Sequence, residues 1–405
     1  MIGGLKMEQN NAFSPERVRI SFFGRRNAGK SSLVNAITSQ DMSLVSEVMG
    51  TTTDPVSKTM ELLPIGPVFI TDTPGIDDEG GIGQMRVKRA LRELERTDIA
   101  VIVVDFAAGA GRYERDLISK LEEMKTPYIV AFNKCDILGQ YPAETEKSVY
   151  VSALKGVNIN RLKEKIGEVV KAGKEREFLP DIVEKGDKIV LVVPIDQSAP
   201  KGRLILPQQR TIRELLDREA TAVVTVPDGL KDALLEDGKR PKMVITDSQV
   251  FGYVNKITPK DVYLTSFSIL FARYKGNLPL LAKGAFALDS LEENSRVLIS
   301  EGCTHHRQCK DIGSVKIPGW IREHTGKNMS FDFSSGPDFP EDLSPFSAVI
   351  HCGGCMLNEK EMSYRIRRAV AEGVPITNYG TAIAHMNGML ERSLEPFGGV
   401  EGILE

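Results

Sequence analysis

The chain has 405 residues, with 52 lysines and arginines against 55 aspartates and glutamates, for a formal charge of −3. This length predicts two or three domains, and the near-neutral balance argues against a general nucleic-acid binder, which usually presents a basic face. No apolar run reaches the roughly 18–20 residues of a membrane span. Residues 1–15 show no secretory pattern, so we expect a cytoplasmic protein without a membrane partner.

The first segment, residues 1–175, contains a P-loop. A strand pattern at 17–23 runs into Gly24-Arg-Arg-Asn-Ala-Gly-Lys-Ser31, and a helix pattern follows from Ser32. In such a loop the glycines let backbone N–H groups surround phosphates, the lysine adds positive charge, and the serine hydroxyl reaches Mg²⁺. We therefore predict nucleotide contacts for Gly24, Asn27, Gly29, Lys30, Ser31 and Ser32.

Further motifs follow in the order that a GTPase requires. Thr52, in Gly-Thr-Thr-Thr-Asp, suits a switch that contacts Mg²⁺, while Asp72 and Gly75 suit a water-mediated Mg²⁺ contact and a γ-phosphate sensor. The base pocket is predicted at Asn133, Lys134, Asp136, Ser152 and Ala153. Asp136 can accept hydrogen bonds from N1 and N2 of guanine, a donor pair that adenine lacks. The set predicts GTP binding and hydrolysis, with catalytic roles for Lys30, Thr52, Asp72 and Gly75.

The P-loop, switch and Asp72-Thr-Pro-Gly motifs resemble the tRNA-modification (TrmE/MnmE) branch of translation-factor-like GTPases. That resemblance implies that Asn27 helps to hold K⁺, the alternative being a loop-shaping hydrogen bond. Ile76 stands where Ras-type enzymes have a water-positioning glutamine. An apolar side chain cannot orient water, so we expect slow hydrolysis that is stimulated by potassium or by dimerisation.

The middle segment, residues 176–265, predicts a small α/β domain. Strand patterns at 189–193, 222–226 and 242–246 alternate with helix patterns at 209–218, 228–236 and 248–254. Asp196, Lys201 and Asp247 could form a site, but loop ends and a helix cap explain them better. Sheet edges need to be paired or covered, so we predict dimerisation as the role of this domain.

The last segment, residues 266–405, predicts a second doubly wound α/β sheet with a metal site. Apolar strand patterns at 296–300 and 347–350 precede Cys303 and the run His351-Cys352-Gly-Gly-Cys355. If the two strands are neighbours, their carboxyl ends bring the three thiols together. The residues alone leave zinc and an iron–sulfur cluster equally open. Candidates for a fourth ligand, or for support of the ligands, are His305, His306, His351, Cys309 and Asp311.

The order of the domains and the pattern Cys303-Thr-His305 … His351-Cys352-Gly-Gly-Cys355 resemble the HydF family over nearly the whole chain. HydF proteins are GTPase scaffolds that mature (FeFe) hydrogenase. The resemblance implies a 4Fe-4S cluster on Cys303, Cys352 and Cys355, and a carried di-iron precursor. It also implies radical-SAM maturation enzymes and apo-hydrogenase as partners.

The expected fold class is thus α/β with three domains: a P-loop GTPase, a dimerisation domain and a cluster domain. We expect a homodimer or higher oligomer with no nucleic-acid partner. Two other functions compete with the scaffold. One is a TrmE-like tRNA-modification GTPase, against which the charge balance argues. The other is a zinc-stabilised GTPase switch, which metal analysis would distinguish.

Overall fold

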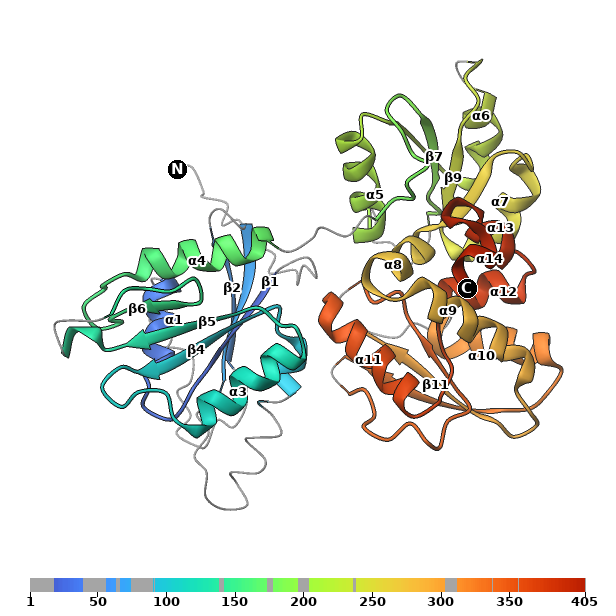
Figure 1. Cartoon of the computed structure of the whole chain (residues 1–405). Coiled ribbons are helices and arrows are strands. Elements are labelled where there is room, and N and C mark those ends of the chain that lie inside the picture. The colour runs from blue at the N-terminus through green and yellow to red at the C-terminus, as the bar shows by residue number, and fades with distance from the viewer. Residues whose placement is uncertain are drawn as a thin grey trace, which may run out of the picture. The chain divides into compact units, whose positions relative to one another are not determined.

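The computed structural model describes residues 18–38, 56–62, 66–73, 90, 92–137, 142–172, 178–195, 204–235, 238–302, 312–336, 338–355 and 357–404. The chain divides into two compact units, Met1–Glu175 and Arg176–Glu405 (Figure 1). Each unit is built on parallel strands with helices packed against them, and the predicted α/β class is confirmed. None of the described helices has both the length and the apolar character needed to cross a membrane.

The first unit contains one sheet with the strand order β2-β3-β1-β4-β5-β6. Only β2 runs antiparallel to its neighbour. The central strand β4 is buried on both faces, as expected for an apolar strand inside a helix-covered parallel sheet. The strands are β1 (Val18–Phe23), β2 (Val56–Leu62), β3 (Gly66–Asp72), β4 (Ile99–Asp105), β5 (Tyr128–Asn133) and β6 (Ser148–Tyr150).

Helices cover both faces of this sheet. On one face α1 (Lys30–Thr38) and α4 (Ile159–Ala172) bury Leu33, Ile37 and Leu162 against the strands. On the other face α3 (Arg112–Glu123) packs through Leu117 and Leu121. The short helix η2 (Cys135–Ile137) follows β5.

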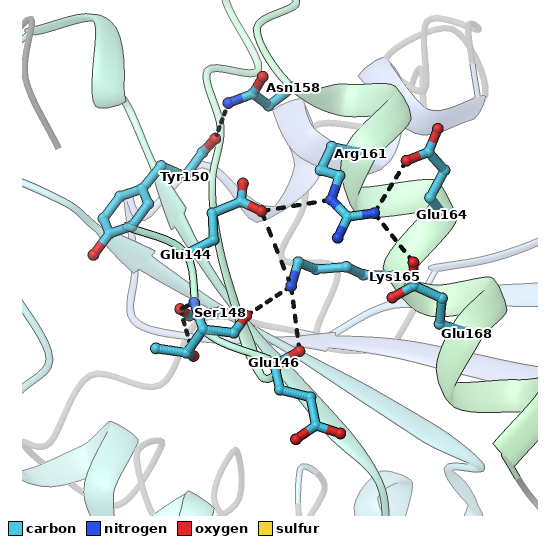
Figure 2. A network of polar contacts seen from close by, with 10 residues as sticks. Glu144, Glu146, Ser148, Tyr150, Asn158, Arg161, Glu164, Lys165 and Glu168 are labelled. Atoms are coloured by element: carbon cyan, nitrogen blue, oxygen red, sulfur yellow. Dashed lines mark hydrogen bonds and ion pairs between the residues drawn. The ribbon is translucent and has the colours of Figure 1, made fainter. Parts of the chain in front are cut away.

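A polar network ties α4 to the loop that leads into β6 (Figure 2). The Lys165 ammonium, which is almost fully buried, donates to the carbonyls of Thr145 at 2.7 Å and Glu146 at 3.3 Å. Arg161 pairs with Glu144, Glu164 and Glu168. These contacts fix the strand that precedes the predicted base-binding residues Ser152 and Ala153.

The second unit contains two sheets. The strand order of the first is β10-β9-β7-β8, with all neighbours parallel. Helices α5 and α8 pack on one face, and α6 and α7 pack on the other. In chain order the elements are β7 (Lys188–Val192), α5 (Leu206–Asp217), β8 (Thr221–Thr225), η3 (Pro227–Gly229), α6 (Leu230–Leu235), β9 (Met243–Thr246), η5 (Ser248–Val250), α7 (Phe251–Ile257), β10 (Tyr263–Ser266) and α8 (Phe267–Lys275).

The second sheet of this unit has the order β12-β11-β13-β14, again parallel throughout. Helices α9 and α11 pack on one face, and α10 and α12 on the other, so the predicted doubly wound sheet is confirmed. The elements are α9 (Leu278–Phe286), η6 (Ala287–Ser290), β11 (Arg296–Glu301), η7 (Ile312–Lys316), α10 (Ile317–Thr325), β12 (Ser330–Ser335), β13 (Ala348–His351), α11 (Glu359–Ala371), β14 (Ile376–Asn378), α12 (Tyr379–Met386), α13 (Leu390–Leu394), η8 (Glu395–Phe397) and α14 (Gly399–Leu404).

The two sheets share a hydrophobic core. One cluster joins Val190, Val244 and Leu264 of the first sheet to Leu298 and Val349 of the second. Helix α8 lies between the sheets and contributes Ile269 and Ala272 to the same cluster. A single apolar interior therefore stabilises both sheets together.

Candidate functional site

The P-loop links β1 to α1. At two of its positions only glycine fits. Gly24 has φ +152°, and a Cβ there would lie 2.3 Å from the carbonyl oxygen of Val103. Gly29 has φ +88°, and its Cβ would lie 2.2 Å from the side-chain nitrogen of Asn133. Lys30 donates to the carbonyls of Gly24 at 2.9 Å and Arg25 at 2.8 Å, so its ammonium lies over the loop.

The two predicted Mg²⁺ residues meet where β1 and β3 end side by side. The Ser31 hydroxyl donates to Oδ2 of Asp72 at 2.5 Å. The other carboxylate oxygen, Oδ1, is buried and has no hydrogen-bond partner within the described residues. Burial raises the pKa of Asp72, although Ser31 and the Lys30 charge act in the opposite direction. A hydroxyl beside an unsatisfied carboxylate oxygen suits Mg²⁺, so these residues fit the ion that a bound nucleotide would bring.

The predicted base pocket is clamped to the P-loop by two side chains of β5 and its end. Asn133 donates to the carbonyl of Ala28 at 3.0 Å and accepts from the Ala153 amide at 3.0 Å. Lys134 donates to the carbonyl of Asn27 at 2.9 Å. The predicted base-binding and phosphate-binding loops are therefore held together by direct hydrogen bonds.

The Lys134 ammonium also pairs with Asp105 at 2.6 Å. Burial opposes the shift, but the hydrogen bond and charge of Lys134 hold the pKa of Asp105 below its usual value. Asp105 ends β4 as Asp72 ends β3. Sequence reasoning missed Asp105, although a polar residue that closes an apolar strand was an available signal.

Two of the three predicted cluster cysteines, Cys352 and Cys355, follow β13 at the switch point of the last sheet. Strands β11 and β13 are adjacent, with Ser300 opposite His351. Strand order reverses here, since β12 lies beyond β11 on one side and β14 lies beyond β13 on the other. Clefts at the carboxyl ends of such strands are the usual ligand sites of open α/β sheets. The two strands are thus neighbours, which is the condition that the predicted metal site requires.

Backbone N–H groups surround the sulfur of Cys352. The amide of Gly302 lies 3.0 Å from Sγ, and the amide of Gly354 lies 3.4 Å from it. Such donors stabilise a negatively charged thiolate, and the thiolate is the form of cysteine that binds metals. The sulfur therefore has the environment of a ligand.

A buried lysine holds the loop between the two cysteines and the residues just after it. Lys275, at the end of α8, is 3% exposed. Its ammonium donates to the carbonyls of Gly354 at 3.3 Å, Cys355 at 3.2 Å and Leu357 at 2.9 Å. A buried cation against three carbonyls fixes the loop and adds positive potential near the thiols.

His351 is fully buried, and both of its ring nitrogens have partners. Nδ1 lies 2.7 Å from the carbonyl of Cys352 and must donate to it, so Nε2 accepts from Arg365 at 2.9 Å. Arg365 also binds Glu361 at 3.0 Å and the Ser300 hydroxyl at 3.3 Å. Burial and the Arg365 charge lower the pKa of His351 to about 3, so the ring is neutral.

A cavity of about 180 Å³ adjoins the cysteine loop. Gly353 and Tyr379 line it from the last sheet, and Asp247, Ser248 and Gln208 line it from the preceding sheet. Asp247 caps η5, as predicted, by accepting from the Gln249 amide. The cavity thus joins the carboxyl ends of both sheets in this unit.

The described residues include most of the predicted nucleotide contacts. Asp136 and Ser32 are exposed, at η2 and in the first turn of α1. Outside the described residues lie Thr52, Gly75, Cys303, His305, His306, Cys309 and Asp311. Sequence reasoning missed Lys275 and Arg365, because isolated basic residues in helix patterns usually belong to solvated faces.

The P-loop, the Ser31–Asp72 pair and the Asn133 clamp define the first unit as a GTPase domain of the P-loop class. A family model for 50S ribosome-binding GTPases matches residues 19–134. The second unit matches the Hydrogen maturase F dimerization domain at residues 178–276 and the Hydrogen maturase F tetramerization domain at residues 279–396. The chain belongs to the hydrogen maturase F (HydF) family, and the expected family and three-domain layout are confirmed.

Curated relatives match the GTPase part. The tRNA modification GTPase MnmE of Thiobacillus denitrificans is 30% identical over 152 residues, which are 37% of this chain and 33% of that protein. GTPase Der of Wolinella succinogenes is 35% identical over 172 residues, 38% of this chain and 36% of that protein. The chain thus spans about a third of the length of these two relatives. A solved structure, a probable GTP-binding protein engB, is 25% identical with a TM-score of 0.33 and covers 38% of this chain and all of that one.

Proposed function

We propose that this chain is a GTP-hydrolysing scaffold that carries a di-iron precursor during maturation of (FeFe) hydrogenase. The observation that carries the proposal is the Cys352 thiol, held by backbone N–H groups at the switch point of a sheet that lies in the tetramerization-domain match. A GTPase domain precedes this sheet in the same chain. The combination supports a nucleotide switch joined to a metal-binding domain.

In the GTPase domain, Lys30 would leave the carbonyls of Gly24 and Arg25 and place its charge on the β- and γ-phosphates of GTP. Ser31 would bind Mg²⁺ directly, and Asp72 would bind it through water; Thr52 and Gly75 would complete the switch contacts. Asp136 is exposed and suited to read guanine. Hydrolysis should be slow because Ile76 cannot orient water, and K⁺ held by Asn27 should stimulate it.

In the last domain, Cys303, Cys352 and Cys355 would hold a 4Fe-4S cluster. Three cysteine ligands would leave the fourth iron of such a cluster free to bind another ligand. The tautomer of His351 supports a role in orienting the loop, since neither ring nitrogen has a lone pair to offer. His305 and Asp311 remain candidates for the fourth position or for its support.

The cavity beside Gly353 is the place we propose for the di-iron precursor. Its walls offer the Tyr379, Ser248 and Gln208 side chains as hydrogen-bond partners for small anionic ligands on iron. Radical-SAM maturation enzymes would supply the precursor, and apo-hydrogenase would accept it. The dimerization and tetramerization domains support a homodimer or a higher oligomer.

The test is iron and sulfide analysis with EPR on the full chain, reconstituted and reduced without oxygen. Cys352→Ser should lose the four-iron signal, and added cyanide should perturb that signal in the wild type. Cys135→Ser is the matched control, because Cys135 is buried in the GTPase unit. One zinc per chain without iron uptake would refute the cluster, and equal loss in both variants would refute the assignment to Cys352.

A further inference from the structure

Three metal-binding side chains meet on the last domain outside the cysteine site. Nε2 of His324 lies 2.7 Å from Oδ1 of Asp289, and Nε2 of His385 lies 2.9 Å from the same oxygen. One ligand atom from each residue lies within 4.8 Å of those of the other two. The sequence spacing gives no sign of this group, since 35 and 96 residues separate the histidines from Asp289.

Each of the three side chains extends outward from a backbone position that the core holds. Asp289 follows Leu288 in η6, His324 comes one turn after Ile321 in α10, and Leu288 and Ile321 are fully buried. His385 comes one turn after the buried Ala382 in α12. The Phe286 ring packs edge-on against the His385 ring at 5.0 Å between centroids. The ligand atoms are therefore carried on packed helical elements instead of loose loops.

The group lies at the edge of the sheet opposite the cysteines. In an α/β sheet, helices that follow parallel strands run back toward the amino ends of those strands. The C-terminal turns of α10 and α12, which carry His324 and His385, therefore lie at the amino edge, while Cys352 follows the carboxyl end of β13. A ligand held by the triad would be separate from the cysteine site.

The donor set and its spacing suit a transition metal. Two imidazole nitrogens and one carboxylate leave open positions for water, as in catalytic zinc and ferrous sites. Zinc with bonds of about 2.0–2.1 Å in tetrahedral geometry separates its ligands by about 3.3 Å. The observed histidine–aspartate contacts of 2.7 and 2.9 Å need to open by about half an ångström, and the two nitrogens, at most 4.8 Å apart, need to reach the same separation. The negative ends of the two helix dipoles also favour a cation at this point.

Exposure and charge are consistent with metal access. The side chains of His385, His324 and Asp289 are 11%, 25% and 55% exposed, so an ion can enter from solvent. Burial would raise the pKa of Asp289, but hydrogen bonds from His324 and His385 outweigh that effect and hold the pKa below its usual value. The carboxylate is therefore ionised at neutral pH, as a ligand must be.

We propose that Asp289, His324 and His385 form a second metal site that binds a divalent first-row transition-metal ion such as Zn²⁺ or Fe²⁺. The ion replaces the Nε2 proton of each histidine. A neutral ring moves that proton to Nδ1, and a protonated ring releases it to solvent and keeps the proton on Nδ1. The site needs neither GTP nor the cluster, so it stands or falls independently of the scaffold function.

The test is metal titration of the full chain with Zn²⁺ and, as an optical probe, Co²⁺. The wild type should bind one more zinc than Asp289→Asn or His385→Ala, or should bind it at least about tenfold more tightly, since even partners of metal ligands are worth about 10–100-fold. Glu292→Gln is the matched control, an exposed carboxylate three residues away that is not in the group. It should bind zinc as the wild type does.

The cobalt spectrum separates the two sites. The equivalent lost in Asp289→Asn should lack thiolate-to-cobalt absorption, whereas the equivalent lost in Cys352→Ser should carry it. Metal-free melting curves would check that each variant is folded. Unchanged zinc stoichiometry and affinity in Asp289→Asn would overturn the site, as would thiolate absorption in the equivalent that it loses.

Discussion

Replacing Lys275 by methionine tests how the cysteine loop is held. The substitution removes an ammonium that lies over the Phe271 ring and donates to three loop carbonyls, at Gly354, Cys355 and Leu357. The hydrogen bonds to Gly354 and Leu357 are buried. A buried acceptor left unsatisfied costs about 1–3 kcal/mol, so the loss should be about 3 kcal/mol after allowing for the relieved desolvation of the charge.

The loss of stability should be confined to the cysteine loop. About 3 kcal/mol corresponds to roughly a hundredfold change in an equilibrium constant, so amides of residues 352–357 should exchange hydrogen about a hundred times faster. Hydrogen–deuterium exchange with mass spectrometry on the full chain measures this. Cobalt or zinc should also bind the thiols more weakly, because the loop must be reordered before it can bind.

Lys283→Met is the control, since Lys283 is an exposed residue of α9 and loses the same charge. Unchanged exchange at residues 352–357 in Lys275→Met would refute the reasoning. Equal acceleration in both variants would show that net charge, and not the three hydrogen bonds, controls the loop.

Three further predictions concern the nucleotide site and self-association. Asp72→Asn should abolish the Mg²⁺-dependent part of GTP affinity, a loss of at least about tenfold, measured with a fluorescent GTP analogue with and without Mg²⁺; equal affinity in both would contradict the assignment. Asp105→Asn should destabilise the GTPase unit by at most about 1 kcal/mol, since the ion pair is partly exposed. Folding lowers the pKa of Asp105, so this contribution to stability is present above about pH 3.9 and is lost as the pH falls through the pKa of the folded state. If the variant still melts at a lower temperature than the wild type at the most acidic pH that melting curves allow, the ion pair is not the cause. Val224→Lys, on the edge strand β8 where Val224 is 47% exposed, should weaken self-association in light scattering, whereas Leu235→Lys on α6 should not.

The sequence was sufficient for features that rest on local patterns. The P-loop glycines, the carboxylate at the end of β3 and the strands before the cysteines lie where the patterns predicted them. Each depends on a short run of residues with a fixed physical role, such as a backbone with positive φ at Gly29 or an apolar strand buried on both faces. The alternation of strands and helices predicted the doubly wound sheet, whereas the adjacency of β11 and β13 was only a condition for the metal site.

Other features could not be predicted because they depend on contacts between distant segments. The bonds from Lys275 to the three loop carbonyls and from Arg365 to His351 join elements whose sequences look like ordinary helix ends and faces. The pattern over residues 381–394 predicts one final helix, but the structure has two: α12 ends at Met386 and α13 begins at Leu390. Gly388, with φ +65°, stops α12, and Asn387-Gly388 was the missed signal. Strand β10 and helix α8 also had no clear pattern.

The apolar interior that runs from Val190 to Val349 has a consequence for how this chain can be divided. A cut at residue 277, between the two domain matches, would strip the last sheet of the side chains of α8 and expose Leu281 and Ile366 to water. The isolated halves should aggregate or bind one another again. Swaps between family members should therefore exchange residues 176–405 as one block, because both sheets and the helices up to α14 form one folded body.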